Sequence, residues 1–110
     1  MRTADIIRRY IDVFQGDDRD AVGELLSDDL LFSSPLDVRI DKAAYFERCW
    51  ANRHMVRILE IEKLFEEGEE AFIRYRAQRT EDKGTFRNTE FIRCREGKIT
   101  EVQVYFGADD

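Results

Sequence analysis

The first part of the chain carries apolar residues at helical spacing. Over residues 4–15 the apolar side chains fall on one stripe and the charged side chains on the other faces, which predicts an amphipathic helix. Asp17 or Asp18 can cap a second helix that follows the first along the chain. The two apolar stripes consist of Ile6, Ile7, Tyr10, Ile11 and Phe14 in the first helix, and Ala21, Val22, Leu25 and Leu26 in the second.

A short strand and a third helix are expected next. Residues 30–34 suit a strand, which Pro35, the only proline of the chain, would end. Asp41 is placed to cap a helix over residues 42–54. The stripe of that helix is formed by Ala43, Phe46, Trp50 and His54.

From Val56 onward the apolar pattern changes to that of strands. We predict strands over 56–65, 71–80, 85–95 and 98–106, where alternate side chains point to opposite faces of a sheet. The acidic run 66–70, Gly84 and Glu96-Gly97 mark the turns between them. Helices followed by antiparallel strands predict an α+β fold in which a bent sheet carries its helices on one face.

The register of the last hairpin decides which side chains share a face. A two-residue turn would place Glu90 opposite Gln103, whereas a three-residue turn with Gly97 in the left-handed conformation would place it opposite Val102. We favour the second register, because it gathers one apolar face from Ile92, Cys94, Val102, Val104 and Phe106. Glu90 is then a lone carboxylate in an apolar surface, where burial raises its pKa. In the alternative, Glu90 is a solvated strand residue.

Composition limits the classes of function. The 110 residues suit one domain, 1–110, with a single core. A formal net charge of −6 disfavours binding to nucleic acid or to an anionic membrane. Neither a membrane span nor the apolar segment of a signal peptide is present, so we expect a cytoplasmic protein. Cys49 and Cys94 fit neither a disulfide framework nor a zinc site, and we predict no metal.

Several short motifs resemble one known superfamily. The N-terminal motifs are Arg9-Tyr10-Ile11, Gly16-Asp17-Asp18, Leu-Leu-Ser-Asp-Asp at 25–29 and Phe-Ser-Ser-Pro at 32–35, and the C-terminal ones are Asn-Thr-Glu-Phe-Ile-Arg at 88–93 and Tyr-Phe-Gly at 105–107. In this order they resemble SnoaL-like and NTF2-like proteins, ketosteroid isomerases among them. The resemblance covers nearly the whole chain and implies an NTF2-like cone, with three N-terminal helices packed on a strongly curved, mixed or antiparallel sheet.

The resemblance to ketosteroid isomerases implies three catalytic candidates. Tyr10 matches the tyrosine of that family's oxyanion hole, and Glu90 matches its protonated acid, one methylene longer. The family's general base corresponds to Ser34, which has no partner base and cannot shuttle protons at neutral pH. Asp37 is the carboxylate that could replace it; an exposed loop acid is the alternative.

Pocket-lining residues are expected on the inner wall of the cone. Aromatic residues on a helical stripe are also typical of a plain core, and His54 could face solvent at a helix end. Cys49 suits a small buried filler better than a nucleophile. The candidates for ligand binding are Phe14, Phe32, Ser34, Phe46, Trp50, His54, Tyr75, Ile92, Val102, Val104 and Phe106.

Two functions remain open at this stage. The resemblance implies a small-molecule-binding domain for an apolar, polyketide-like or steroid-like ligand, with isomerase, cyclase or hydratase chemistry that needs no cofactor. The alternative is a non-catalytic homodimeric interaction module with a vestigial pocket. Its interface would be the outer face of the sheet, where Phe72, Phe91 and Tyr105 are interleaved with arginines. The resemblance implies a homodimer in both cases.

Overall fold

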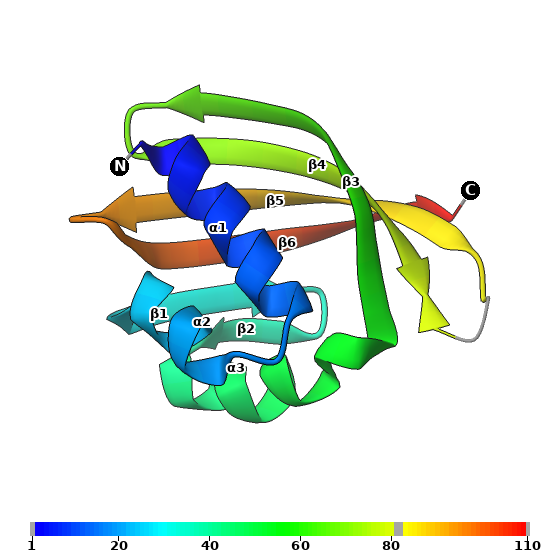
Figure 1. Ribbon diagram of the computed structural model, residues 1–110, viewed down its shortest axis with the longest axis horizontal. Coiled ribbons are helices and arrows are strands. Elements are labelled where there is room, and N and C mark those ends of the chain that lie inside the picture. Colours follow the sequence, from blue (N-terminus) through cyan, green and yellow to red (C-terminus); the bar gives the residue numbers. More distant parts are fainter. Residues whose placement is uncertain (1, 81–82, 110) are drawn as a thin grey trace.

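The structure, a computed structural model, describes residues 2–80 and 83–109 (Figure 1). Its helical elements are α1 (Thr3–Gln15), α2 (Arg19–Leu25), α3 (Lys42–Arg48) and the 3₁₀-helix η1 (Trp50–Met55). Its strands are β1 (Leu26–Ser34), β2 (Asp37–Ile40), β3 (Val56–Glu67), β4 (Glu70–Arg79), β5 (Thr85–Arg95) and β6 (Lys98–Asp109). The predicted α+β class and the predicted helices packed on a curved sheet are confirmed.

The six strands form one open, mixed sheet in the order β2-β1-β6-β5-β4-β3. β1 runs parallel to β6, and the other neighbouring strands are antiparallel. The helices cover one face, which α1 crosses, and β3 bends sharply along its length (Figure 1). Two bulges interrupt the pairing of β3 with β4, and bulges of this kind bend a strand. The curvature leaves space between the sheet and the helices.

The helix ends are fixed by side chains that the sequence places there. Asp18 accepts a hydrogen bond from the Ala21 amide at 3.0 Å and begins α2, and Asp41 caps α3 in the same way. Lys42 then donates its Nζ to the carbonyls of Gly23 and Leu26 at 2.9 and 3.0 Å. This lysine satisfies carbonyls at the end of α2 and ties α3 to it.

The third helix is shorter than predicted. It ends at Arg48, and residues up to Met55 form the 3₁₀-helix η1 instead of continuing to 54. Asn52 donates its side-chain amide to the Arg48 carbonyl at 2.7 Å, and Arg53 donates to the Trp50 carbonyl at 3.0 Å. Side chains that compete for these carbonyls tighten the turn.

Three strands, β1, β3 and β6, are longer than predicted, β5 has the predicted bounds, and one strand was missed. β1 begins at Leu26 rather than residue 30, β6 extends to Asp109, and the four-residue strand β2 follows the turn at Pro35. β2 carries the exposed residue Val38 and has no alternation that marks a buried face. Among the residues described, no helix has the length and apolar character needed to cross a membrane.

Both registers considered for the last hairpin are wrong. Glu96 and Gly97 have φ of 54° and 81° and form a two-residue turn, so that Arg95 pairs with Lys98. The pairing then shifts by one residue at a bulge, and Glu90 lies opposite Val104. The shift restores the face that we predicted, because Glu90 shares its side of the sheet with Ile92, Cys94, Val102 and Val104.

Candidate functional site

A cavity of about 200 Å³ lies between the helices and the inner face of the sheet. It reaches the surface beside Gln15 and Asn52, which are exposed. Most of its wall is apolar or aromatic, and a few polar groups converge on it, as in small-molecule sites. Its lining consists of Tyr10, Ile11, Phe14, Gln15, Phe32, Tyr45, Cys49, Asn52, Arg53, Val56, Ile58, Tyr75, Asn88, Glu90 and Val104.

Glu90 is the acid of this cavity. It lies on the inward side of β5 and is 7% exposed, and its Oε2 accepts a hydrogen bond from the Tyr75 hydroxyl at 2.5 Å. Burial raises the pKa of Glu90 to about 7, against a smaller lowering by the bond from Tyr75. Its Oε1 accepts no hydrogen bond from any residue described. Glu90 therefore occurs in both protonation states near neutral pH, and its Oε1 is available to a ligand.

Asn88 supports this acid through Tyr75. The two residues are cross-strand partners, and the Asn88 amide donates to the Tyr75 hydroxyl at 3.3 Å. The Asn88 Oδ1 in turn accepts from the backbone N–H of Gly107 at 3.4 Å. A chain of hydrogen bonds thus runs from the backbone of β6 to the carboxyl of Glu90.

Gly107 is required for the close approach of the two strands. A Cβ atom at this position would lie 2.0 Å from the carbonyl oxygen of Arg87. Only glycine lacks that atom, so the last residue of the Tyr-Phe-Gly motif allows the contact on which Asn88 depends.

Tyr10 and Tyr45 form a second polar pair in the cavity wall. Their hydroxyl oxygens are 2.5 Å apart, and both rings are buried. Burial raises the pKa of both phenols, which stay neutral. Two phenols hold two protons, but they share one hydrogen bond, so one O–H donor remains without a partner among the described residues.

The structure brings together six of the predicted site residues. These are Tyr10, Phe14, Phe32, Tyr75, Glu90 and Val104. Among these six residues, the hydrogen bonding differs from the expected arrangement. The phenol that touches Glu90 belongs to Tyr75, whereas the hydroxyl of Tyr10 turns to Tyr45.

The remaining catalytic candidate lies outside the cavity wall. Asp37 begins β2, where its Oδ1 is 2.6 Å from Nη2 of Arg48, and its side chain is 10% exposed. The alternative of an exposed loop acid is therefore wrong, because Asp37 is largely buried and paired with Arg48, whereas its role as a replacement base stays a prediction. Ser34 accepts a hydrogen bond from the Leu36 amide in the adjacent turn and does not line the cavity as described.

Three ligand-binding residues predicted on the third helix do not line the cavity. Phe46 packs between Tyr45, Trp50 and the guanidinium of Arg19. Trp50 is buried and carries Arg53 over its ring at 4.1 Å. The side chain of His54 is 70% exposed and lies 3.6 Å from Asp17, because the helix tightens before this residue.

The other three predicted residues come from the last hairpin. Ile92 and Val102 pair with each other and are fully buried in the core rather than at the cavity. Phe106 is 54% exposed, since β6 continues past the end of β1 at this point. The face of the sheet on which these three residues lie was predicted correctly. The sequence does not indicate how far along each strand the cavity extends.

Sequence reasoning missed several lining residues. Asn88 lies two positions before Glu90, so strand alternation could have identified it. Tyr45 lies four positions before Cys49 on α3, which places both on one helical side. Gln15 reaches the cavity from the end of α1, and Asn52 and Arg53 reach it from within η1. No pattern in the sequence indicates this.

None of the described lining residues supplies a strong nucleophile. Burial raises the pKa of the Cys49 thiol to about 11, so the thiol stays protonated at neutral pH. Among the described residues, no group of three or more histidine, cysteine, aspartate or glutamate side chains is placed to hold a metal ion. What the arrangement offers chemically is one carboxyl with a raised pKa and one phenolic donor.

Comparison with solved structures gives the fold alone, because identities are low. An NTF2-like protein of unknown function from Cytophaga hutchinsonii shares 21% identity and a TM-score of 0.82, covering 96% of this chain and 90% of its own. A candidate ketosteroid isomerase from Kribbella flavida has 16% identity and a TM-score of 0.79, with coverages of 96% and 78%. A candidate polyketide cyclase from Sinorhizobium meliloti has 18% identity and a TM-score of 0.77, with coverages of 94% and 99%.

The sequence itself decides the family. No curated protein matches the chain. The SnoaL-like domain matches residues 7–102, a span that contains all the lining residues of the cavity named above except Val104. The chain therefore belongs to the SnoaL-like family, and its fold is similar to that of an NTF2-like protein.

Proposed function

We propose that the protein binds a small carbonyl compound in the cavity and catalyses proton transfer on it without a cofactor. The observation that supports this most is Glu90, a buried carboxyl with a pKa of about 7 and one unbonded oxygen at the cavity wall. A general base works best when its pKa lies near the working pH. The likeness in fold to a candidate isomerase and a candidate cyclase agrees with chemistry of this kind.

The proposed step uses two groups of the cavity. The carboxylate of Glu90 takes a proton from the carbon beside the ligand's carbonyl, and the electron pair of that C–H bond moves into an enolate. The free O–H of the Tyr10–Tyr45 pair donates to the enolate oxygen, where negative charge develops. Glu90 then returns the proton to carbon, at the same atom or at a conjugated one, which gives exchange or isomerisation.

Deuterium exchange tests the proposal. We expect the protein in D₂O at pH 7 to accelerate hydrogen exchange beside the carbonyl of 2-cyclohexen-1-one, followed by proton NMR. Glu90→Gln should lower the rate about 100-fold or more, because the amide cannot accept the proton. Glu101→Gln, on the opposite face of the sheet, is the matched control and should keep the rate. Exchange that Glu90→Gln leaves unchanged, or no acceleration by the wild type with either this ketone or a larger one such as androstenedione, would refute the proposal.

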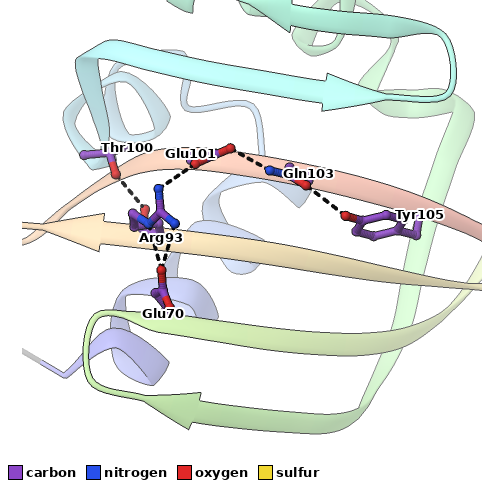
Figure 2. A network of polar contacts seen from close by, with 6 residues as sticks. All are labelled: Glu70, Arg93, Thr100, Glu101, Gln103 and Tyr105. Atoms are coloured by element: carbon purple, nitrogen blue, oxygen red, sulfur yellow. Dashed lines mark hydrogen bonds and ion pairs between the residues drawn. The ribbon is translucent and has the colours of Figure 1, made fainter.

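The second candidate function is a homodimeric interaction module. The aromatic and arginine side chains on the outer face of the sheet support it. Phe72 and Phe91 are cross-strand partners there, with ring centroids 5.2 Å apart, and Phe72 is 49% exposed. Beside them, Arg93 bonds to Glu70 and Glu101, and the network continues through Gln103 to Tyr105 (Figure 2). Aromatic and arginine side chains on one face are typical of protein interfaces.

A further inference from the structure

We infer that the ligand of this cavity is an uncharged single-ring carbonyl compound of about eight non-hydrogen atoms, an inference that rests on the proposed function. The inferred ligand class is narrower than the one that the family resemblance implies. Three features of the cavity support it: its volume, the rigidity of its wall and the charge balance of its polar groups.

The volume limits the ligand to one ring. An apolar protein cavity of about 150 Å³ accommodates benzene, which corresponds to about 25 Å³ for each non-hydrogen atom. By the same ratio, the 200 Å³ of this cavity accommodates about eight such atoms. A six-membered ring with a carbonyl and one small substituent meets this limit. The fused rings of a steroid exceed this volume and would have to extend through the opening beside Gln15 and Asn52.

The wall has little freedom to widen. Tyr10 packs on Phe14 with ring centroids 5.8 Å apart, and Tyr45 packs on Phe32 at 5.4 Å. The hydroxyls of Tyr10 and Tyr45 also bond each other, so the two aromatic contacts form one continuous unit. A ligand that pushed one of these rings aside would have to break contacts of the others, which are closely packed.

The charges of the cavity favour a neutral ligand. Arg53 is the one cationic side chain in the described lining, and its Nη2 is already 2.6 Å from Oδ1 of Asp17 while its guanidinium covers Trp50. A ligand carboxylate would therefore have to compete with Asp17 for Arg53, whose buried Nε has no partner among the described residues, and would meet the acid Glu90. Placing an unpaired charge in such a site is costly. A carbonyl oxygen, in contrast, has the unused phenolic O–H as its donor.

Direct binding to the intact protein tests the inference. We expect 2-cyclohexen-1-one to give saturable shifts of backbone amide NMR signals around the cavity. 1-Tetralone, with two fused rings, should bind at least tenfold more weakly, and androstenedione, with four, should give no saturable shifts. Cyclohexanecarboxylate, a single ring with a charge, should not bind. Equal or tighter binding of the steroid or of the carboxylate, or no binding of the single ring, would overturn the inference.

Variants of Val104 test whether the cavity sets the limit. This half-buried residue lines the cavity from β6. Val104→Ala should strengthen binding of 1-tetralone several-fold relative to 2-cyclohexen-1-one, and Val104→Phe should abolish binding of both. An unchanged preference in Val104→Ala would count against the inference. Binding of 2-cyclohexen-1-one without deuterium exchange would refute the proposed chemistry but leave the inferred ligand class standing. Deuterium exchange on the steroid alone would refute the ligand class but leave the chemistry standing.

Discussion

At the scale of single residues, Glu90 links the stability of the fold to pH. Its carboxyl is neutral in the folded protein over a range in which it would be ionised in the unfolded chain. Burial raises the folded-state pKa from the model-compound value of 4.5 to about 7. The stability associated with the neutral carboxyl is complete below the unfolded pKa and is lost as pH rises through the folded pKa.

Glu90→Gln should remove this pH dependence. Between about pH 4.5 and pH 7, wild type should lose about 3 kcal/mol of unfolding free energy relative to the variant, at about 1.4 kcal/mol for each pH unit. Urea denaturation of both proteins at matched pH values measures the difference. Carboxyls whose pKa is lowered by arginines, such as the half-buried Glu62, act in the opposite direction but are common to both proteins. A difference that stays constant with pH would show that Glu90 is not buried in its neutral form.

The sequence alone indicated the chemical role of individual residues better than it indicated which residues they bond to. The alternation of β5 was enough to identify Glu90 as an acid on an apolar face, because strand side chains have a fixed period of two. Which hydroxyl bonds to Glu90 depends on packing between β4 and β5, and which bonds to Tyr10 depends on where α3 rests. Neither contact is local in sequence, so Tyr75 and Tyr45 could not be assigned to these roles.

At the scale of elements, the β5–β6 hairpin positions the acid. Its turn is set by two residues with positive φ, and a bulge then shifts the pairing by one residue. Thr100 lies at this bulge and donates its hydroxyl to the Arg93 carbonyl at 3.1 Å. The turn was identified from Glu96-Gly97, but a bulge has no comparable sequence signal, which is why both predicted registers failed. The early end of α3 has the same kind of cause, since it depends on side chains that bond to carbonyls.

Gly107→Ala should disrupt the far end of the same hairpin. The new Cβ would meet the Arg87 carbonyl at 2.0 Å, so the two strands must separate and the bond from Gly107 to Asn88 must lengthen. We expect a loss of about 2 kcal/mol or more of unfolding free energy by urea titration. Gly16→Ala is the control, because its Cβ would have its nearest contact at 3.6 Å, and it should change stability by about 0.5 kcal/mol or less. Equal effects of the two substitutions would contradict this account.

At the scale of the whole molecule, the sheet separates two surfaces with different chemistry. Its inner face holds the cavity, and its outer face holds the aromatic pair and the polar network of Figure 2. The family resemblance anticipated the curved sheet, although none of its motifs lies in β3 or β4, where bulges interrupt the pairing. It could not anticipate the size of the cavity, which depends on how the rings of Tyr10, Phe32 and Tyr45 pack.

If the outer face is an interface between two copies, light scattering should report twice the 13.1 kDa mass of the chain. Phe72→Glu should then give monomers, because it places a charge in the aromatic centre of the contact, where desolvation is costly. Leu36→Glu is the matched control: Leu36 is 76% exposed but lies in the β1–β2 turn, and its substitution should leave the mass unchanged. A monomeric wild type at about 100 μM, or dimers that persist in Phe72→Glu, would rule this interface out. Such a result would leave the cavity chemistry unaffected, since every residue proposed for it comes from one copy of the chain.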